Sequence, residues 1–154
     1  MDDSQTQNPR LAAARQVAAA IPYSAALGME VHEIDDASVL MSVPYDTRFV
    51  GDAATGVMHG GVITALLDSC AGTAVMVHPK APGATATIDL RIDYMRAARP
   101  GERVFARAEC FRITRSVAFV RAQAFEAGEE GNPVATASGA FTVEGAGTKF
   151  GGAA

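Results

Sequence analysis

An apolar run of 18 residues, Gly60–Val77, contains a single charged side chain, Asp68. A run of this length and composition predicts one long helix, whose bulky side needs a covering layer. An unpaired carboxylate buried in such a helix is costly, so Asp68 requires a hydrogen-bond partner, a solvated cleft or a function. A purely structural alternative stays open on residue chemistry alone: Asp68 could bond to a backbone amide across a close packing contact.

The two sides of this predicted helix differ in size. On a helical wheel, bulky apolar residues fall opposite Asp68, where they would pack on a sheet. Small residues surround Asp68 itself: Gly61, Thr64, Ala65, Ala71, Gly72 and Val75. This leaves room beside the carboxylate for another backbone or a ligand, and it makes Thr64 a candidate substrate contact.

The start of the helix is the sequence His59-Gly60-Gly61. Free amides in a first helical turn carry partial positive charge, and two glycines leave them open to a ligand. These amides would stabilise the oxyanion of a carbonyl under attack, while Asp68 would activate water or attack directly. His59 is a candidate general base, although a histidine at a helix start is more often an orienting hydrogen-bond partner.

The composition limits the class of protein. A chain of 154 residues with 49% hydrophobic and 19% charged residues predicts a single folded domain. A net charge of −4 argues against nucleic acid as a partner. The acidic, polar start is unlike a signal peptide, and Asp68 interrupts the one apolar run near membrane-spanning length, so we expect a cytoplasmic protein with no membrane partner. Cys70 and Cys110 are expected to be reduced core residues, and the three histidines lack metal-ligand spacing, so no metal is expected.

Hydrophobic periodicity predicts an α+β fold. Residues 9–20 read as a helix, 29–34 and 39–44 as a hairpin, and 45–58 as a polar loop before the central helix. Period-two patterns then predict four consecutive strands, at residues 87–95, 103–111, 117–125 and 134–143. Short turns between strands indicate an antiparallel sheet, which must wrap around the single long helix and leaves an edge that a dimer would cover. We expect a helical lead-in at 1–26, one domain at 27–145 and a flexible tail at 146–154.

The motif Gly56-Val57-Met58-His59-Gly60-Gly61, with Asp68 nine residues after the histidine, resembles the hotdog-fold acyl-CoA thioesterases of the phenylacetate-degradation type. Residues 93–96 and 100–102 resemble the strand and turn of that family, and the resemblance runs from about residue 27 to residue 143. It implies a hotdog fold, a homodimer or dimer of dimers, and hydrolysis of an acyl-CoA to an acid and CoA without a separate cofactor. It also implies sites between protomers, with the thioester carbonyl on a helix-start amide and the carboxylate matching Asp68 from the other subunit.

Five further positions bear on this resemblance. Ala53 stands where the family carries an Asn or Gln that positions substrate or water, which puts the rate in doubt more than the reaction class. Thr87 falls where some relatives hold the attacking water with a serine, although it is equally well explained as the start of a strand. Tyr94 lies in the matched strand and is a candidate substrate contact. Arg96 and Arg99 are candidates for the CoA phosphates, although solvated surface charge is the simpler explanation for each.

Two other functions fit the same fold. Hotdog hydratases and dehydratases pair a histidine with a carboxylate, but their usual His-Phe-Pro or Asp-x-Asn-Pro sequences do not occur around His59. A non-catalytic dimer that binds acyl-CoA would keep the fold, and it would have lost its catalytic rate because Ala53 replaces the positioning Asn or Gln. Aromatic and medium aliphatic acyl groups both fit a pocket of small residues.

Overall fold

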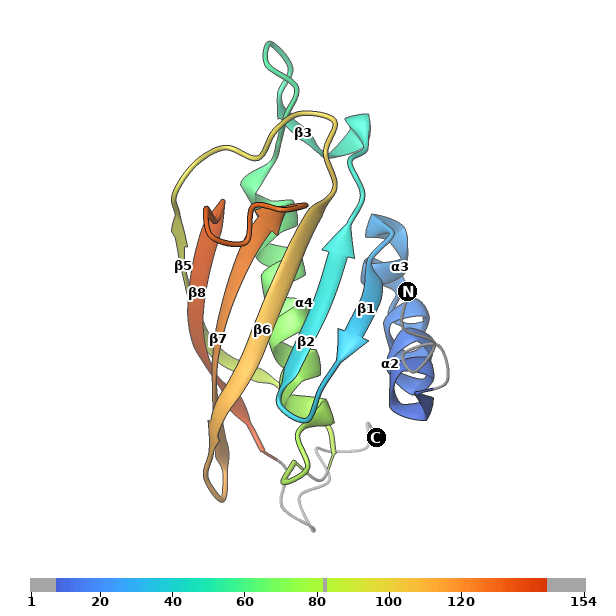
Figure 1. The fold of residues 1–154 in the computed structure, drawn as a ribbon, viewed down its shortest axis with the longest axis vertical. Coiled ribbons are helices and arrows are strands. Elements are labelled where there is room, and N and C mark those ends of the chain that lie inside the picture. Colours follow the sequence, from blue (N-terminus) through green and yellow to red (C-terminus); the bar gives the residue numbers. More distant parts are fainter. Residues whose placement is uncertain (1–7, 82, 144–154) are drawn as a thin grey trace, which may run out of the picture.

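Two helices open the described part of the chain, which comprises residues 8–81 and 83–143 of a computed structural model (Figure 1). Helix α2 covers Pro9–Ala20, and the Asn8 side chain caps it by accepting a hydrogen bond from the Arg10 amide at 2.9 Å. Helix α3 covers Pro22–Leu27, because a proline there fits a first helical turn and cannot continue the preceding helix. The predicted helix is therefore confirmed, and the segment after it is helical too. The expected tail at 146–154 lies outside the described residues.

The long apolar helix is α4, Gly60–Val77. It begins after the cap residue His59 and ends at His78. Eight of its residues are buried: Val62, Ile63, Leu66, Leu67, Cys70, Ala71, Ala74 and Val75. Asp68 is half-buried. Most of the bulky residues are buried and Asp68 is not, as the two-sided pattern predicts, whereas Ala71 and Val75, expected on the Asp68 side, are buried as well.

Helix α4 is also long and apolar enough to cross a membrane by length and composition alone. The argument that Asp68 disqualifies it was therefore too strict, since one charged residue in such a window is tolerated. In the structure the bulky side of α4 packs against the sheet, as expected for the core helix of a folded domain (Figure 1).

A six-stranded antiparallel sheet wraps around α4, in the order β1-β2-β6-β7-β8-β5 (Figure 1). The hairpin strands are β1, Glu30–Ile34, and β2, Ser38–Val43. The later strands are β5, Thr87–Tyr94; β6, Val104–Ile113; β7, Val117–Glu126; and β8, Ala135–Thr142. This confirms the predicted antiparallel sheet around one long helix, with strand bounds close to those expected.

The position of β5 differs from the expected succession of neighbouring strands. It pairs with β8 at the edge of the sheet, and it does not pair with β6, the next strand in the chain. The connection passes over the end of the sheet (Figure 1). It is held there by Glu126, whose fully buried carboxylate accepts hydrogen bonds from the Arg96 guanidinium and from the Arg99 amide. A turn sequence such as Pro100-Gly101 is compatible with a hairpin as well as with a crossover, so it did not predict this connection.

The segment 45–58, expected as a polar loop, contains short regular elements. A 3₁₀ turn, η1, covers Thr47–Phe49, and the strands β3, Val50–Asp52, and β4, Val57–Met58, form a small hairpin. This hairpin projects beyond the end of the main sheet (Figure 1).

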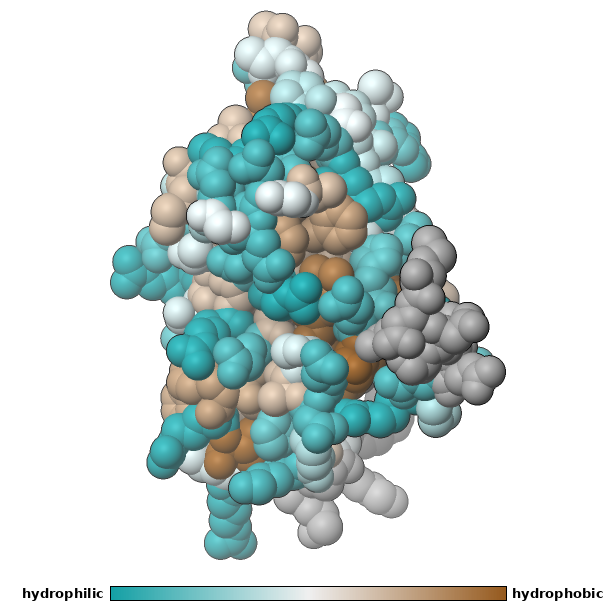
Figure 2. Space-filling view, viewed as in Figure 1, coloured by the Kyte–Doolittle hydropathy of each residue, from teal (hydrophilic) through white to brown (hydrophobic). Residues whose placement is uncertain are grey.

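The outer face of the sheet carries hydrophilic and hydrophobic side chains side by side (Figure 2). Phe105 and Phe125 stack with ring centroids 6.3 Å apart. The guanidinium of Arg107 lies between Glu33 and Glu130, at 3.3 and 2.7 Å. The charge of Arg107 is therefore paired on this face, and α4 lies on the opposite face of the sheet.

Candidate active site

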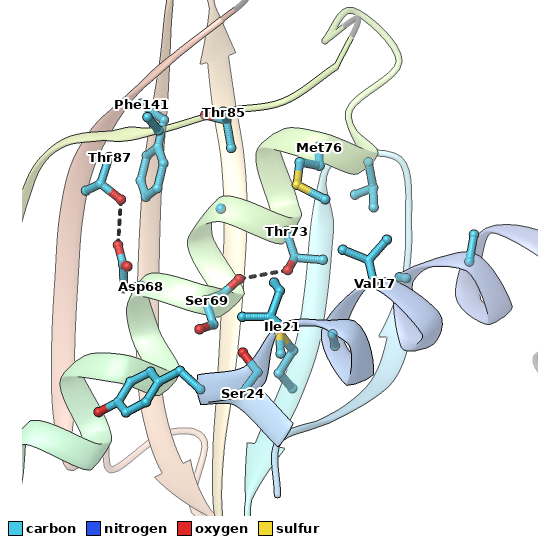
Figure 3. A pocket seen from close by; sticks show the side chains of 18 of the residues that line it. Val17, Ile21, Ser24, Asp68, Ser69, Thr73, Met76, Thr85, Thr87 and Phe141 are labelled. Carbon is cyan, nitrogen blue, oxygen red and sulfur yellow. Dashed lines mark hydrogen bonds between the residues drawn. The ribbon is translucent and has the colours of Figure 1, made fainter. Parts of the chain in front are cut away.

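Asp68 and Thr87 are joined by a hydrogen bond, in which Thr87 Oγ1 donates to Asp68 Oδ1 at 2.8 Å (Figure 3). Asp68 comes from the middle of α4 and Thr87 from the first position of β5. The alternative partner considered for Asp68, a backbone amide, is not seen among the described residues. One carboxylate oxygen is thus held by a hydroxyl, and the half-buried side chain lies at the wall of a cavity.

A β-bulge brings Thr87 to Asp68. Along β5 the residues Leu90, Ile92 and Tyr94 alternate with polar residues, and strict alternation would turn Thr87 away from them. The pairing with β8 shifts register between Thr87 and Asp89, which reverses the side on which Thr87 lies. Bulges often redirect a side chain next to a functional site.

A glycine opposite the bulge permits this geometry. A Cβ on Gly139 of β8 would lie 2.6 Å from the Asp89 carbonyl oxygen and 2.9 Å from a methyl of Leu90. The Asp89 carboxylate accepts a hydrogen bond from the Ala140 amide at 2.9 Å, which helps to fix the irregular pairing. Sequence reasoning missed Gly139, because a glycine inside a strand signals a bulge without showing which side chain it redirects.

The start of α4 has one open amide and one capped amide. His59 Nδ1 accepts a hydrogen bond from the Gly61 amide at 2.8 Å. The Val62 amide donates to the His59 carbonyl at 3.0 Å. The Gly60 amide has no acceptor within the described ranges. Of the two predicted oxyanion donors, Gly60 is therefore the one available in this conformation, and His59 acts as the cap of the helix.

Tyr94 lies beside the same helix start. Its hydroxyl donates to the Gly60 carbonyl at 2.9 Å and forms a short hydrogen bond with the Thr64 hydroxyl. Thr87 is the first residue of β5 and Tyr94 is the last, so hydrogen bonds join β5 to α4 at both ends of the strand. The structure thus brings three predicted site residues together at the helix start: Gly60, Thr64 and Tyr94.

Asp68 and the helix start do not form one compact site within a protomer. Gly61 and Asp68 are seven residues apart on one continuous helix, which corresponds to about 10 Å along its axis at 1.5 Å per residue. A reacting carbonyl needs its amide donor and its base within hydrogen-bond reach. Within one protomer, these two groups therefore lie too far apart along α4 to act on the same carbonyl.

An apolar cavity of about 570 Å³ lies next to Asp68, between α4 and the N-terminal helices (Figure 3). Helix α2 contributes Ala14, Val17 and Ala18 to its wall. Thr87 and Phe141 close the side formed by the sheet. This volume is in the range of small-molecule sites. The sequence predicted room beside Asp68 but not the wall formed by α2, because the residue pattern of α2 does not show which face of α4 it will adjoin.

The predicted substrate contact Ala53 lies in the exposed turn between β3 and β4. The neighbouring Asp52 organises this turn, since its carboxylate accepts hydrogen bonds from the Ala54 amide at 3.0 Å and the Thr55 hydroxyl at 2.8 Å. These bonds lower the pKa of Asp52 below its usual value. The hairpin that carries this turn projects beyond the end of the main sheet (Figure 1), and Ala53 is not among the residues that line the cavity beside Asp68.

Arg96 and Arg99 are both paired with carboxylates. Arg96 binds Glu126, which lowers the pKa of Glu126 to about 2 and raises that of Arg96. Arg99 donates to Glu129 at 2.9 Å. Both guanidinium groups thus have a structural role in the connection between β5 and β6. The sequence did not predict this role, because Glu126, the buried partner of Arg96, lies 30 residues farther along the chain.

The cysteines and histidines are accounted for by the fold. Cys70 and Cys110 are free and buried, and burial raises the pKa of Cys70 to about 12. Over residues 8–81 and 83–143, no three His, Cys, Asp or Glu side chains are grouped as a metal site would require. Around α4 the described residues present the Asp68 carboxylate and the backbone amides of the helix start, a set that suits water or carboxylate attack on a carbonyl carbon.

Comparisons with known proteins agree with this geometry. The family profile of the thioesterase superfamily matches residues 55–131, which include α4 and its start. The chain is 30% identical over 136 residues to the medium/long-chain acyl-CoA thioesterase YigI of Escherichia coli strain K12, covering 80% of this chain and 86% of that protein.

Solved structures share the whole fold. A protein from Pseudomonas aeruginosa is 36% identical, with a TM-score of 0.78, and the match covers 87% of this chain and 98% of that one. A mutant of the phenylacetic acid degradation protein PaaI from Thermus thermophilus is 28% identical, with a TM-score of 0.69 over 80% of this chain and 99% of that one.

Proposed function

This chain belongs to the thioesterase superfamily and has its hotdog fold, and from that premise we propose that it hydrolyses acyl-CoA thioesters to a carboxylic acid and free CoA. The observation that carries the proposal is Asp68, held by Thr87 at the wall of an apolar cavity. A carboxylate in that position can act on a carbonyl whose acyl chain lies in the cavity. The reaction consumes water and needs no cofactor, since CoA enters as part of the substrate.

Asp68 is the group that starts the reaction. As a general base, its carboxylate takes a proton from water while the water oxygen bonds to the thioester carbon. The tetrahedral intermediate then collapses, the carbon–sulfur bond breaks, and the proton passes to the CoA thiolate. As a nucleophile, the carboxylate would instead bond to the thioester carbon and displace the CoA thiolate, which takes up a proton, and water would then cleave the resulting anhydride. Both routes give the same products and require Asp68 to be ionised.

The start of α4 supplies the oxyanion donor. The Gly60 amide points outward at the positive end of the helix, where a developing negative charge on the carbonyl oxygen is stabilised. His59 fixes the first turn by accepting from the Gly61 amide. We therefore assign His59 an orienting role and place the carbonyl oxygen on the open Gly60 amide, next to Gly61.

A second protomer completes the site. The free edge of β5 exposes large apolar side chains, with Ile88 at 57%, Tyr94 at 52% and Met95 at 59% exposure. An unpaired edge with exposed apolar residues is a site for pairing with another copy. A two-fold axis at this edge would set two α4 helices antiparallel, so that Asp68 of one protomer meets the Gly60 amide of the other. We propose this dimer, alone or as a dimer of dimers, as the functional unit.

The motif around His59 supports the phenylacetate-degradation type as the subgroup, and we propose it on that basis. The CoA phosphates would lie outside the cavity. Arg96 is held by the buried Glu126, so of the two proposed arginines Arg99, which is half-exposed, is better able to exchange its carboxylate partner for a phosphate.

A thiol-release assay on a panel of acyl-CoA thioesters tests the function. We expect turnover with at least one aliphatic or aromatic thioester, together with stoichiometric formation of the free acid. Calorimetry with free CoA and with a non-hydrolysable thioether analogue runs beside it. Tight analogue binding without thiol release across the panel would contradict the hydrolase and identify a binding protein.

A further inference from the structure

We infer that the cavity between α2 and α4 is the binding site for a saturated acyl chain of about ten carbons, and that Gly72 and Met76 set its length. This inference rests on the proposed function, because the chain is that of the substrate whose thioester Asp68 attacks. It assigns a substrate class and two specificity-determining positions to the protomer that supplies Asp68. The groove is defined here as the space between the Asp68–Val77 face of α4 and helix α2.

Exposed apolar side chains converge on this groove. Among the described residues eight large hydrophobic side chains are exposed, and four of them line the groove: Val17, Ile21, Tyr23 and Met76. Figure 3 shows Val17, Ile21 and Met76 around the same space. Apolar side chains exposed together are costly unless a ligand or a partner covers them. They are continuous with Asp68, so an apolar extension of the reacting group is the ligand that fits.

The polarity of the groove changes along its length. Near Asp68, the lining includes the hydroxyl-bearing residues Ser24 and Ser69 (Figure 3). Farther along, the walls include Val17, Met76 and Thr73, and the Thr73 hydroxyl donates to the Ser69 carbonyl of its own helix at 2.7 Å. This order matches an acyl-CoA, whose polar thioester lies at Asp68 and whose alkyl chain points away from it.

The far end of the groove is closed by Arg10. Its guanidinium donates to the Val77 carbonyl at 2.5 Å and to the Asp36 carboxylate at 2.8 Å. A methyl group pushed against this paired guanidinium would desolvate it without replacing its hydrogen bonds, which is unfavourable. The groove therefore has a polar stop at the end of α4.

The length of the groove follows from the helix. Asp68 and Met76 are eight residues apart, or about 12 Å along α4 at 1.5 Å per residue. An extended alkyl chain with carbon–carbon bonds of about 1.5 Å and bond angles of about 111° advances about 1.25 Å per carbon. The groove therefore accommodates about ten carbons.

Gly72 keeps the middle of the groove open. A Cβ at this position would lie 3.7 Å from the Phe141 ring and 3.9 Å from the Thr85 methyl, which is ordinary contact. Substitution here therefore narrows the groove without forcing the backbone to move. Gly72 is four residues from Asp68, or about 6 Å along the helix, so a larger side chain would obstruct the groove at about the fifth carbon.

The test measures kcat/KM on acyl-CoA substrates from acetyl to tetradecanoyl, and Kd for the matching non-hydrolysable thioethers. For the wild type we expect kcat/KM to rise and Kd to fall, each about fourfold per added methylene, up to about ten carbons. Beyond that length both should level off. Gly72→Val should move this break to about five carbons and lower kcat/KM on decanoyl-CoA more than tenfold, with kcat/KM on butyryl-CoA unchanged. Met76→Ala should move the break to longer chains.

Two further variants serve as controls. Gly72→Ala adds one methyl group and should shift the break in the same direction as Gly72→Val by a smaller step, with thermal unfolding to show that the fold is intact. Phe111→Ala removes an exposed apolar side chain of β6 that does not line the groove, and it should leave the break where it is.

The outcomes separate this inference from the proposed function. Hydrolysis and binding with no break, or with a break that neither Gly72→Val nor Met76→Ala moves, would overturn the acyl groove and leave the thioesterase standing. Chain-length-independent thioether binding would instead indicate that a second protomer covers these residues, and it too overturns the groove. A movable break in thioether binding without hydrolysis would support the groove and contradict the enzyme.

Discussion

Thr87 Oγ1 lies 2.8 Å from Asp68 Oδ1 and ties the edge strand of the sheet to the middle of the central helix. This single contact orients the one carboxylate on α4 and leaves its second oxygen without a partner among the described residues. It depends on the bulge in β5, and the bulge depends on Gly139 in the neighbouring strand. The geometry of the proposed base is therefore set by the sheet edge at which we propose dimerisation.

Replacing Thr87 by Val removes the hydroxyl and preserves the shape and the strand preference of the side chain. We expect kcat to fall about tenfold with KM little changed, as for loss of a hydrogen bond to a charged group. Thr87→Ser, which keeps the hydroxyl, is the matched control and should stay close to the wild-type kcat. Equal losses in both variants would mean that the hydroxyl does not position Asp68.

Active sites shared across a two-fold axis can be rebuilt from two inactive protomers. Asp68→Asn removes the base, and Gly61→Val disturbs the helix start, since a Cβ there would lie 2.9 Å from His59 Nδ1. Co-refolding the two variants in equal amounts should restore about a quarter of the wild-type rate, because half the dimers are mixed and each has one intact site. An active monomer in sedimentation, or no rescue in proven mixed dimers, would contradict the shared site.

Ala53 occupies an exposed turn at the tip of the β3–β4 hairpin. If an amide there positions substrate in the family, Ala53→Asn should raise kcat on a good substrate and change the free energy of unfolding little. Ala54→Asn, in the same turn, controls for the added amide and should not raise kcat. An unchanged rate in folded Ala53→Asn would show that another group has taken over this role.

The ion pair of the buried Glu126 with Arg96 makes the free energy of unfolding depend on pH. The pKa of Glu126 is lowered from 4.5 to about 2 in the folded protein, so its contribution is present above pH 4.5 and is lost as the pH falls toward 2. We expect Glu126→Gln to lower the free energy of unfolding at pH 7 by about 3 kcal/mol. Denaturant titrations should show this gap closing between about pH 4.5 and 2.

Glu102→Gln is the control for that experiment. Glu102 is half-exposed and lies 3.8 Å from Arg99, so its removal should change stability by less than about 1 kcal/mol at any pH. A pH-independent gap between wild type and Glu126→Gln would show that the loss reflects packing rather than the lowered pKa.

The sequence predicted the parts of this fold that follow from local periodicity. The long helix with one small-residue side, the hairpin before it and the strands after it are all present, because each has a residue pattern of its own period. The position of β5 was not predicted, since the contact that routes the chain past the sheet joins Arg96 to Glu126, far apart in sequence. Non-local ion pairs leave no local pattern.

The candidate site shows the same division. Asp68 could be selected because an isolated carboxylate in an apolar helix is costly, and Gly60 and Gly61 because a helix start with glycines is open. The contact of Thr87 with Asp68 could not be derived, because alternation places Thr87 on the wrong face and only the bulge corrects it. The wall that α2 adds to the groove beside α4 could not be predicted either, since it depends on where α2 packs.

The most direct test of the account is kcat/KM of Asp68→Asn on decanoyl-CoA. Asn keeps an oxygen that can accept from Thr87, so the fold should be preserved while the base or nucleophile is lost. Asp35→Asn, in the turn between β1 and β2, is the matched control and should retain the wild-type value. We predict a loss on the order of 100-fold or more for Asp68→Asn, the size expected for removing such a group. Wild-type turnover in a folded Asp68→Asn variant would contradict the assignment of Asp68 as the catalytic carboxylate.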